Sequence, residues 1–287
     1  LVLGGPFLPH IERILRAKAS SMCSPVVSAS DAGNKCTLKG IDMFNVKPCM
    51  SCDMVIQTEQ GIHLSLDLPD IRLRMLGAHQ LQNAMTATCA ALCLHNQGWK
   101  ISDGSIRAGL DHTYILGRGQ ILSPAEAAAL GISGSTVLLD GAHTRNSAKA
   151  LADTIQMTFP EARVALVVAM ASDKDHLAFA KELLSRIQLE AILLAEVGIA
   201  GGRSRTAPAC TLREAWIQAS LELGIDIIHD CFASKHTTVV ASDPSVVGSM
   251  RLGHRILGER SRDEFTNLLV VTGSLHAVAS ALASLHL

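Results

Sequence analysis

The sequence predicts an α/β fold built on a doubly wound, mostly parallel sheet. In the second half of the chain, short apolar strands alternate with helices of about 10–15 residues, a pattern typical of βαβ units. Hydrophobic residues make up 48% of the 287 residues, and most of them are Ala, Leu, Ile and Val. Aromatic residues make up only 3%, which disfavours a sandwich rich in aromatic side chains.

The first part of the chain has a less regular pattern than the second. Residues 28–60 are rich in small polar residues, which indicates a loop or an edge hairpin. Arg72–Leu76 is expected to pair with the strand before it. The other expected elements are strands at Leu1–Gly4, Ser24–Val27 and Ile62–Leu68, and helices at Pro6–Ala19 and from Leu81 to a point before Gly98.

The second part contains the alternation that predicts the parallel sheet. Ligands of such sheets bind at the carboxyl ends of the strands, so the residues after each strand are the first candidates for a site. The expected strands are Val137–Asp140, Val164–Ala169, Ala191–Leu194, Ile225–His229 and Leu268–Thr272, and the expected helices are Ser147–Met157, Asp175–Ile187, Thr211–Leu223 and Ser274–Leu285.

The formal net charge of −1 gives the chain no general attraction to nucleic acid or to an acidic membrane. No apolar run reaches the roughly 18 residues of a membrane span. We therefore expect neither nucleic acid nor a membrane as a partner. The chain starts at Leu1 inside a predicted strand, without a Met or a signal peptide, so we expect a truncated chain without its targeting segment.

Eight cysteines in a chain of this length do not indicate a disulfide scaffold. Cys49 and Cys52 form a CxxC and Cys36 precedes it, but no second CxxC supplies the other ligands of a zinc site. We interpret these thiols as incidental residues of a polar insertion and predict no metal site. Cys89 and Cys93, one helical turn apart, are expected in the core.

The segment Leu139–Ser147 places an acid, a glycine and a histidine between a buried strand and a helix. Asp140 ends the strand, and His143 stands just before the helix N-terminus, whose free amides favour anions. This arrangement could bind an anion or a phosphoryl group. The alternative is that Asp140 and the Asn and Ser after it are ordinary turn and N-cap residues.

Two further segments have the same ambiguity. Gly77–Ala87 is a helix start with a small-residue face, in which His79 could merely cap and Asn83 could merely be exposed. Gly117–Gln120 places Arg118 between two glycines, from where a guanidinium could grip a phosphate with two hydrogen bonds. The alternative for Arg118 is a solvated charge in a linker.

The usual nucleotide-binding loops are absent from the sequence. No segment matches GxxxxGK[ST], the loop whose backbone amides and Lys hold nucleotide phosphates. The pairs Gly4-Gly5 and Gly201-Gly202 lack the Lys and the Ser or Thr that follow in that loop. A GxGxxG fingerprint between a strand and a helix is also missing, which disfavours an NAD-dependent oxidoreductase.

Taken in order, these segments resemble the folylpolyglutamate/dihydrofolate synthases of the Mur ligase superfamily. The resemblance rests on Gly77–Ala87 (G-x-H-Q-x-x-N-A-x-x-A), Gly117–Gln120 (GR-x-Q) and Leu139–His143. In addition, Ala169–Asp175 resembles the DKD segment of the family, and Val271–Leu275 resembles its GSL segment. Together the segments span nearly the whole chain.

The resemblance implies a ligase that uses ATP and Mg²⁺ to convert a pterin carboxylate, of dihydropteroate or folate, into an acyl phosphate. The amine of L-glutamate then attacks that intermediate. Residues 1–116 would be the remainder of a central P-loop-type ATPase domain, and residues 117–287 a Rossmann-like Mur ligase C-terminal domain. The P-loop, the metal ligands and the modified Lys of the family would lie upstream, so the chain alone is expected to be inactive. The resemblance also implies a monomer in the cytoplasm or the mitochondrion.

The resemblance further assigns roles to individual side chains, three of which would be catalytic and none of which would bind metal. Gln80 and Asn83 would lie by the adenine, Arg118 would contact the ATP phosphates, Asp140 would bind on the nucleotide side, and His143 and Ser274 would lie near the incoming glutamate and the acyl phosphate; the catalytic three are Arg118, Asp140 and His143.

The chain departs from the family pattern at two places. Thr144-Arg145 replaces an Asn-Pro, and His276 stands where the family often has Tyr. Both departures bear on substrate choice more than on reaction class. The alternative function is a non-catalytic Rossmann-like binding module derived from such a ligase, which the missing P-loop favours. The retention of Arg118, Asp140, His143 and Ser274 favours the enzyme, because a binding module has no need of all four.

Overall fold

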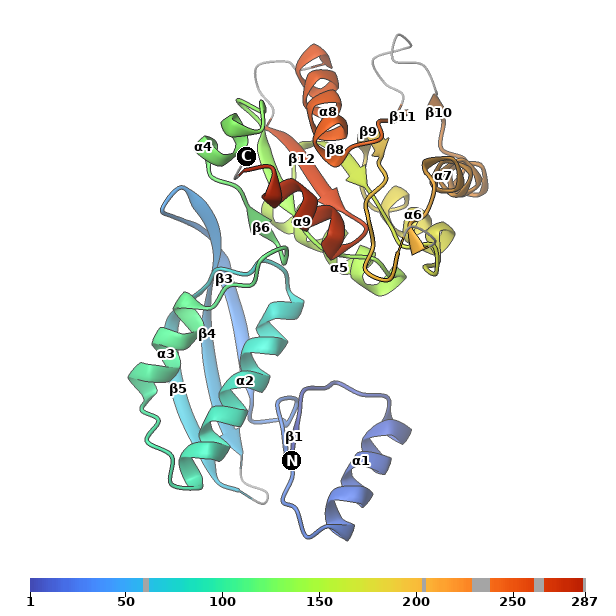
Figure 1. Cartoon of the computed structure of the whole chain (residues 1–287). Helices are drawn as coiled ribbons and strands as arrows, with labels where there is room; N and C mark the ends of the chain where they lie inside the picture. Colours follow the sequence, from blue (N-terminus) through green and yellow to red (C-terminus); the bar gives the residue numbers. More distant parts are fainter. Residues whose placement is uncertain (59–61, 203–204, 229–237, 261–265, 286–287) are drawn as a thin grey trace. The chain divides into compact units, whose positions relative to one another are not determined.

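The computed structural model describes the whole chain except residues 59–61, 203–204, 229–237, 261–265 and 286–287. The chain divides into two compact units, Leu1–Tyr114 and Ile115–Leu287 (Figure 1). The division lies close to the boundary expected after residue 116. Each unit is described by itself.

The first unit combines a pair of short parallel strands, an antiparallel sheet and helices. Its elements are β1 (Val2–Leu3), α1 (Pro9–Ser21), β2 (Val27–Ser28), β3 (Lys35–Phe44), β4 (Lys47–Thr58), β5 (Leu64–Leu73), α2 (His79–Asn96) and α3 (Asp103–His112). β1 pairs with β2, and β3, β4 and β5 form a three-stranded antiparallel sheet in that order.

Three features of the first unit bear on the predictions. The polar stretch 28–60 forms the hairpin of β3 and β4, one of the two expected alternatives. The expected pairing of Arg72–Leu76 with the preceding strand is wrong, because Arg72 lies in β5 itself and β5 pairs with β4. The helix α3 was not predicted, although Ser102 and Ser105 form a capping box at its start.

The second unit is the predicted α/β layer structure. Its elements are β6 (Gln120–Ile121), α4 (Pro124–Ala129), β7 (Thr136–Leu139), α5 (Arg145–Thr158), β8 (Arg163–Val168), α6 (His176–Leu184), β9 (Leu189–Leu194), α7 (Ala209–Leu223), β10 (Ile227–Ile228), β11 (Thr238–Ser242), α8 (Val246–Arg260), β12 (Asn267–Thr272) and α9 (Leu275–Ala283). The elements β6, α4, β11 and α8 were not predicted, and His229, the expected end of β10, lies outside the described residues.

The sheet of the second unit has seven strands in the order β10-β11-β9-β8-β12-β7-β6. All neighbouring pairs are parallel except β6 and β7. The chain moves outward from β7 to β8 and β9, and it returns through α8 to place β12 between β7 and β8. Right-handed crossovers in opposite directions put their helices on opposite faces of the sheet. The predicted doubly wound, mostly parallel fold is therefore confirmed.

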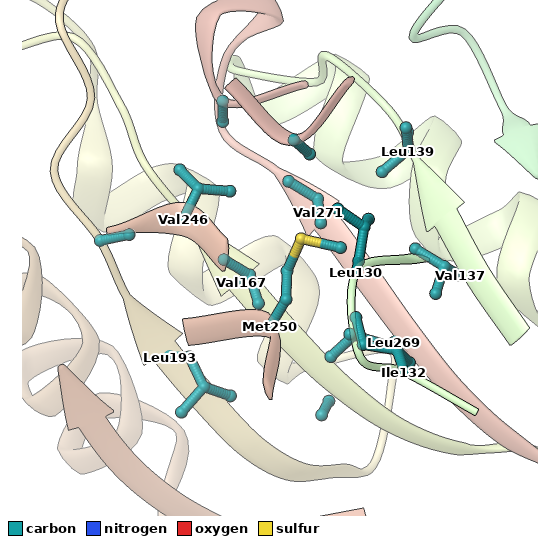
Figure 2. Packing of buried hydrophobic residues seen from close by; sticks show 14 of the residues in the cluster. Leu130, Ile132, Val137, Leu139, Val167, Leu193, Val246, Met250, Leu269 and Val271 are labelled. Atoms are coloured by element: carbon teal, nitrogen blue, oxygen red, sulfur yellow. The ribbon is translucent and has the colours of Figure 1, made fainter. Parts of the chain in front are cut away.

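One face of this sheet packs against α4, α8 and α9. Side chains alternate along a strand, so Val137 and Leu139 of β7 point to this face and Leu138 points to the other. Figure 2 shows Met250 of α8 beside Leu130 and Val271 in the same buried cluster. The strands are apolar almost throughout because both of their faces are covered. No helix in the described part of the chain is long and apolar enough to span a membrane.

The unpredicted helix α8 contains three glycines, which obscure its helical pattern in the sequence. Gly253 is buried, and a Cβ built on it would lie 2.9 Å from Leu269 Cδ1 and 3.1 Å from Leu193 Cδ2. Gly258 is exposed, and a Cβ there would meet nothing within 4 Å. Gly253 thus lets the helix lie close to the sheet.

We expect Gly253→Val to lower the free energy of unfolding of the chain by about 2–3 kcal/mol, because the added methyl groups overpack a filled core. Gly258→Val is the matched control in the same helix, and it should change that free energy by less than about 0.5 kcal/mol. Urea denaturation of both variants measures the difference. Equal effects of the two substitutions would contradict the close packing of α8.

Candidate functional site

Three loops meet at the carboxyl ends of β7 and β12. The Gly141 N–H donates to the Gly117 carbonyl at 2.8 Å, and the Gly273 N–H donates to the Ala142 carbonyl at 2.8 Å. The Asp140 N–H donates to the Val271 carbonyl at 3.0 Å. The helix after β7 and the helix after β12 leave to opposite faces of the sheet. This is the topological switch point at which doubly wound sheets bind ligands.

Asp140 links two of these loops through its carboxylate. Its Oδ2 accepts a hydrogen bond from the Gly119 N–H at 2.8 Å, and its Oδ1 accepts one from the Ala142 N–H at 2.9 Å. These two hydrogen bonds join the turn at Gly119 to the loop after β7. Asp140 therefore both holds the turn at Gly119 and presents negative charge at the switch point.

Arg118 lies in a tight turn between two glycines with left-handed backbone, Gly117 (φ 70°) and Gly119 (φ 58°). The Gln120 side chain closes the turn, because its Oε1 accepts from the Gly117 N–H at 3.0 Å. Gly117 is also required sterically, since a Cβ there would lie 2.8 Å from Val278 Cγ1. Arg118 is half-buried and has no ion-pair partner among the described residues. A guanidinium held this way is available to an anion.

His143 follows Asp140 and precedes α5. Its Nδ1 lies 2.8 Å from the Gly141 carbonyl, which can only accept, so Nδ1 carries the proton of the neutral ring. Nε2 is then the unprotonated nitrogen. The His143 N–H donates to Ser147 Oγ at 3.0 Å, and Thr144 and Ser147 form a capping box at the start of α5. The contact at Nδ1 thus orients the ring, and the contact with Ser147 fixes the backbone of His143.

The unusual Arg145 has an ion-pair partner in the same unit. Its Nε lies 3.1 Å from Glu182 Oε2 on α6. Hydrogen bonds from Arg186 and then from Arg145 lower the pKa of Glu182. The charge that replaces the expected Pro is therefore used to join α5 to α6.

Ser274 lies at the start of α9 and is buried. Its hydroxyl donates to the Ala169 carbonyl at 2.8 Å, and its Oγ accepts from the Ala277 N–H at 3.1 Å. The only proton of the hydroxyl is thus used within the protein. The side chain caps α9 and ties it to the end of β8, and the expected closeness of Ser274 to glutamate remains a prediction.

His276 and Arg205 lie beside the site through contacts that the sequence did not reveal. The loop after β9 pairs with the end of β8, where the Ser172 N–H donates to the Arg205 carbonyl at 2.8 Å. The Ala200 N–H donates to His276 Nε2 at 3.1 Å, which anchors the same loop to α9. Arg205 lies 3.5 Å from Asp173 of the DKD segment. Only the tertiary structure joins these segments.

The predicted adenine residues lie in the first unit, in the first turns of α2. Asn83 Nδ2 donates to Gln80 Oε1 at 2.9 Å, and Gln80 Nε2 lies 3.1 Å from His79 Nε2. Gln80 is buried and Asn83 is exposed. These amides therefore form one local cluster. Among the described residues, no group of three or more His, Cys, Asp or Glu side chains could hold a metal ion.

Comparisons with known proteins agree with this fold. Residues 127–242 match the family model of the Mur ligase glutamate ligase domain. The dihydrofolate synthase/folylpolyglutamate synthase of Bacillus subtilis (strain 168) is 27% identical over 179 residues, which are 61% of this chain and 36% of that protein.

Solved structures are similar along the whole chain. A Mycobacterium tuberculosis folylpolyglutamate synthase complexed with ADP and AMPPCP has a TM-score of 0.71 at 18% identity, over 99% of this chain and 54% of that one. A bifunctional folylpolyglutamate/dihydrofolate synthase with Mn, AMPPNP and L-glutamate bound has a TM-score of 0.63 at 22% identity, over 100% of this chain and 53% of that one. The chain spans about half the length of these structures, and its 179 matched residues span about a third of the curated relative.

The match of 127–242 covers the strands β7, β8, β9 and β11 and the Asp140–His143 loop of the candidate site. The similarity in fold extends over both units. Residues 127–242 are therefore similar to the Mur ligase glutamate ligase domain, and the resemblance of the chain to the folylpolyglutamate and dihydrofolate synthases is confirmed.

Proposed function

We propose that the protein containing this chain is an ATP-dependent amide ligase that joins L-glutamate to a pterin carboxylate, of dihydropteroate or folate, through an acyl phosphate. The observation that carries the proposal is the switch point of the second unit, where Asp140, Arg118 and His143 surround the ends of β7 and β12 in a glutamate ligase domain. The names of the relatives support the substrates, and ATP and Mg²⁺ follow from the same proposal.

Each residue of the switch point has a chemical task in this reaction. Formation of the acyl phosphate brings a carboxylate and a phosphoryl group together, and the Arg118 guanidinium would stabilise the charge that develops between them. Asp140 keeps the turn of Arg118 in place and would bind on the nucleotide side. His143, with an unprotonated Nε2, would accept a proton from the attacking amine of glutamate.

The remaining residues would position a substrate or contact the nucleotide from the first unit. Ser274 would hold the N-terminus of α9, whose free amides favour a carboxylate such as that of glutamate. Gln80 and Asn83 would contact the adenine of ATP. We assign no metal ligand to this chain, and no segment of it matches a P-loop. In this proposal, residues 1–116 are the remainder of an ATPase domain and residues 117–287 the glutamate ligase domain, which would act as a monomer in the cytoplasm or mitochondrion.

The second candidate is a non-catalytic binding module derived from such a ligase. The observation that favours it is the same missing phosphate loop. The two candidates differ in the turnover of ATP and glutamate that they predict. The ligase candidate predicts activity once a phosphate-binding part is present, and the binding module predicts none in any form.

The first test is turnover of the 287-residue chain beside the complete product of its gene. We expect the complete product to incorporate labelled L-glutamate into dihydropteroate or folate and to release phosphate in an ATP-dependent way. We expect the purified chain to release none, because it lacks the phosphate loop. Turnover by the chain alone would contradict the assignment of phosphate binding to another part. A complete product without activity would favour the binding module.

The second test concerns Arg118 and Asp140. In the active protein, Arg118→Ala and Asp140→Asn should each lower kcat/KM by about 10² or more, because each removes charge or its support at the transition state. Arg255→Ala is the matched control, since Arg255 is exposed and pairs with Glu259 within α8. Thermal unfolding separates lost chemistry from lost structure. Near wild-type turnover of either variant would remove that residue from the site.

The third test separates capping by Ser274 from direct contact with glutamate. Ser274→Ala should lower the free energy of unfolding by about 1–2 kcal/mol, because α9 loses its cap and the Ala169 carbonyl loses its donor. Ser284→Ala, at the other end of α9, should change it by less than about 0.5 kcal/mol. If Ser274→Ala leaves stability unchanged and raises only the KM for glutamate, the hydroxyl is a direct ligand instead.

A further inference from the structure

Cys36 and Cys52 lie side by side on neighbouring antiparallel strands of the first unit. In the β3–β4 register, Cys36 is opposite Met54 and Leu38 is opposite Cys52, so the two cysteines are diagonal neighbours. Residues two apart on a strand share a face, which places both thiols on the same face of the sheet. The Cys52 thiol donates to the Ile71 carbonyl at 3.9 Å, and its interaction with the Cys36 side chain shifts the pKa of both thiols. Both cysteines are free thiols.

The CxxC motif of the sequence is not the relevant pair. Cys49 and Cys52 are three residues apart within the single strand β4, and an odd spacing points side chains to opposite faces of a sheet. Cys52 is completely buried, whereas Cys36 lies on the edge strand β3 and is half-buried. The interpretation of Cys36 and Cys52 as incidental thiols therefore needs revision, because the fold brings them together from separate strands.

The two thiols differ in reactivity in a complementary way. The interaction with the Cys52 side chain lowers the pKa of Cys36, against the opposing effects of burial and of the Asp53 charge. The same interaction, together with burial, raises the pKa of Cys52. The thiolate is the nucleophilic form of cysteine, so the half-exposed Cys36 is the thiol that an oxidant reaches and that attacks it.

We propose that Cys36 and Cys52 form a redox-active pair, in which a peroxide oxidises Cys36 and Cys52 then closes a disulfide between β3 and β4. The Cys36 thiolate attacks a peroxide oxygen, the O–O bond breaks, and Cys36 becomes a sulfenic acid with release of water or alcohol. The Cys52 sulfur attacks the Cys36 sulfur, loses its proton and displaces hydroxide, which leaves as a second water. Two thiols are oxidised and one peroxide is reduced.

The strand geometry allows this bridge with a small movement. Diagonal neighbours have Cα atoms about 7–8 Å apart, and a disulfide needs about 4.4–6.8 Å. β3 is an edge strand, and its register shifts between Leu38 and Gly40, close to Cys36. A bulge at an edge is a place where a strand can bend, so β3 can supply the approach that the bond requires. The proposal is independent of the function proposed for the second unit.

The other described thiols provide internal comparisons. Cys23 and Cys210 are exposed free thiols. Cys89 and Cys93 are buried on α2, and burial raises the pKa of Cys89 to about 11. Exposed single thiols can be oxidised but cannot close a bridge within the fold, and an oxidant in solution does not reach thiols buried on one helix.

The test is a titration of the folded 287-residue chain with hydrogen peroxide, followed by alkylation, digestion without reductant and mass spectrometry. We expect a cross-linked peptide pair containing Cys36 and Cys52, two hydrogens lighter than the sum of its parts, and its loss after dithiothreitol. The cross-link should form at peroxide concentrations at least about tenfold below those that oxidise Cys23 or Cys210 irreversibly.

Three variants complete the test. Cys52→Ser should leave Cys36 as a sulfenic acid that a dimedone probe captures, Cys36→Ser should leave Cys52 reduced, and Cys49→Ser should form the bridge as the parent chain does. If Cys52→Ser does not fold, Cys52→Ala replaces it. The proposal is wrong if Cys36 and Cys52 remain unlinked while Cys23 is fully oxidised, or if Cys49 takes part in the bridge.

Discussion

The position of β12 between β7 and β8 is the constraint on which the rest of the second unit depends. β12 is the last strand in the chain, yet it pairs in parallel with both neighbours, Leu268 opposite Thr136 on one side and Val164 on the other. Its side chains from Leu268 to Thr272 are all buried. Because the register ends β7, β8 and β12 at nearly the same level, the loops after them lie within hydrogen-bonding distance of one another.

Glycines make the meeting of these loops sterically possible. A Cβ on Gly141 would lie 2.4 Å from Leu275 Cδ2, and a Cβ on Gly273 would lie 2.7 Å from the Ala169 carbonyl oxygen. Gly273 also has left-handed backbone, with φ at 97°. Without these residues α9 could not approach the turn after β7. The close approach restricts the backbone around Asp140, which is what a site that must hold charge in one place requires.

Polar groups at the switch point fall into two classes. The Ser274 hydroxyl and the Asp140 carboxylate are used in internal hydrogen bonds, and they hold the loops together. The Arg118 guanidinium has no ion pair among the described residues, and the hydrogen bond at Nδ1 of His143 leaves Nε2 as an acceptor. A positive group and a proton acceptor, held on a frame that other polar groups build, suit the joining of a carboxylate to an amine.

The sequence by itself determined the parallel α/β class, most strands of the second unit, and the position of Asp140 and His143 between a strand and a helix. Short-range patterns were sufficient there, because apolar strands and helix starts are local signals. The helix α8 was missed because its glycines obscure the helical pattern, and Gly253 serves contacts with β9 and β12 that are distant in sequence. The internal role of Ser274, the contact of His276 with Ala200 and the pairing of Cys36 with Cys52 were decided by the tertiary structure alone. Each of these contacts joins segments that are distant in sequence. The order and register of the strands bring those segments together, and local sequence patterns contain neither the order nor the register.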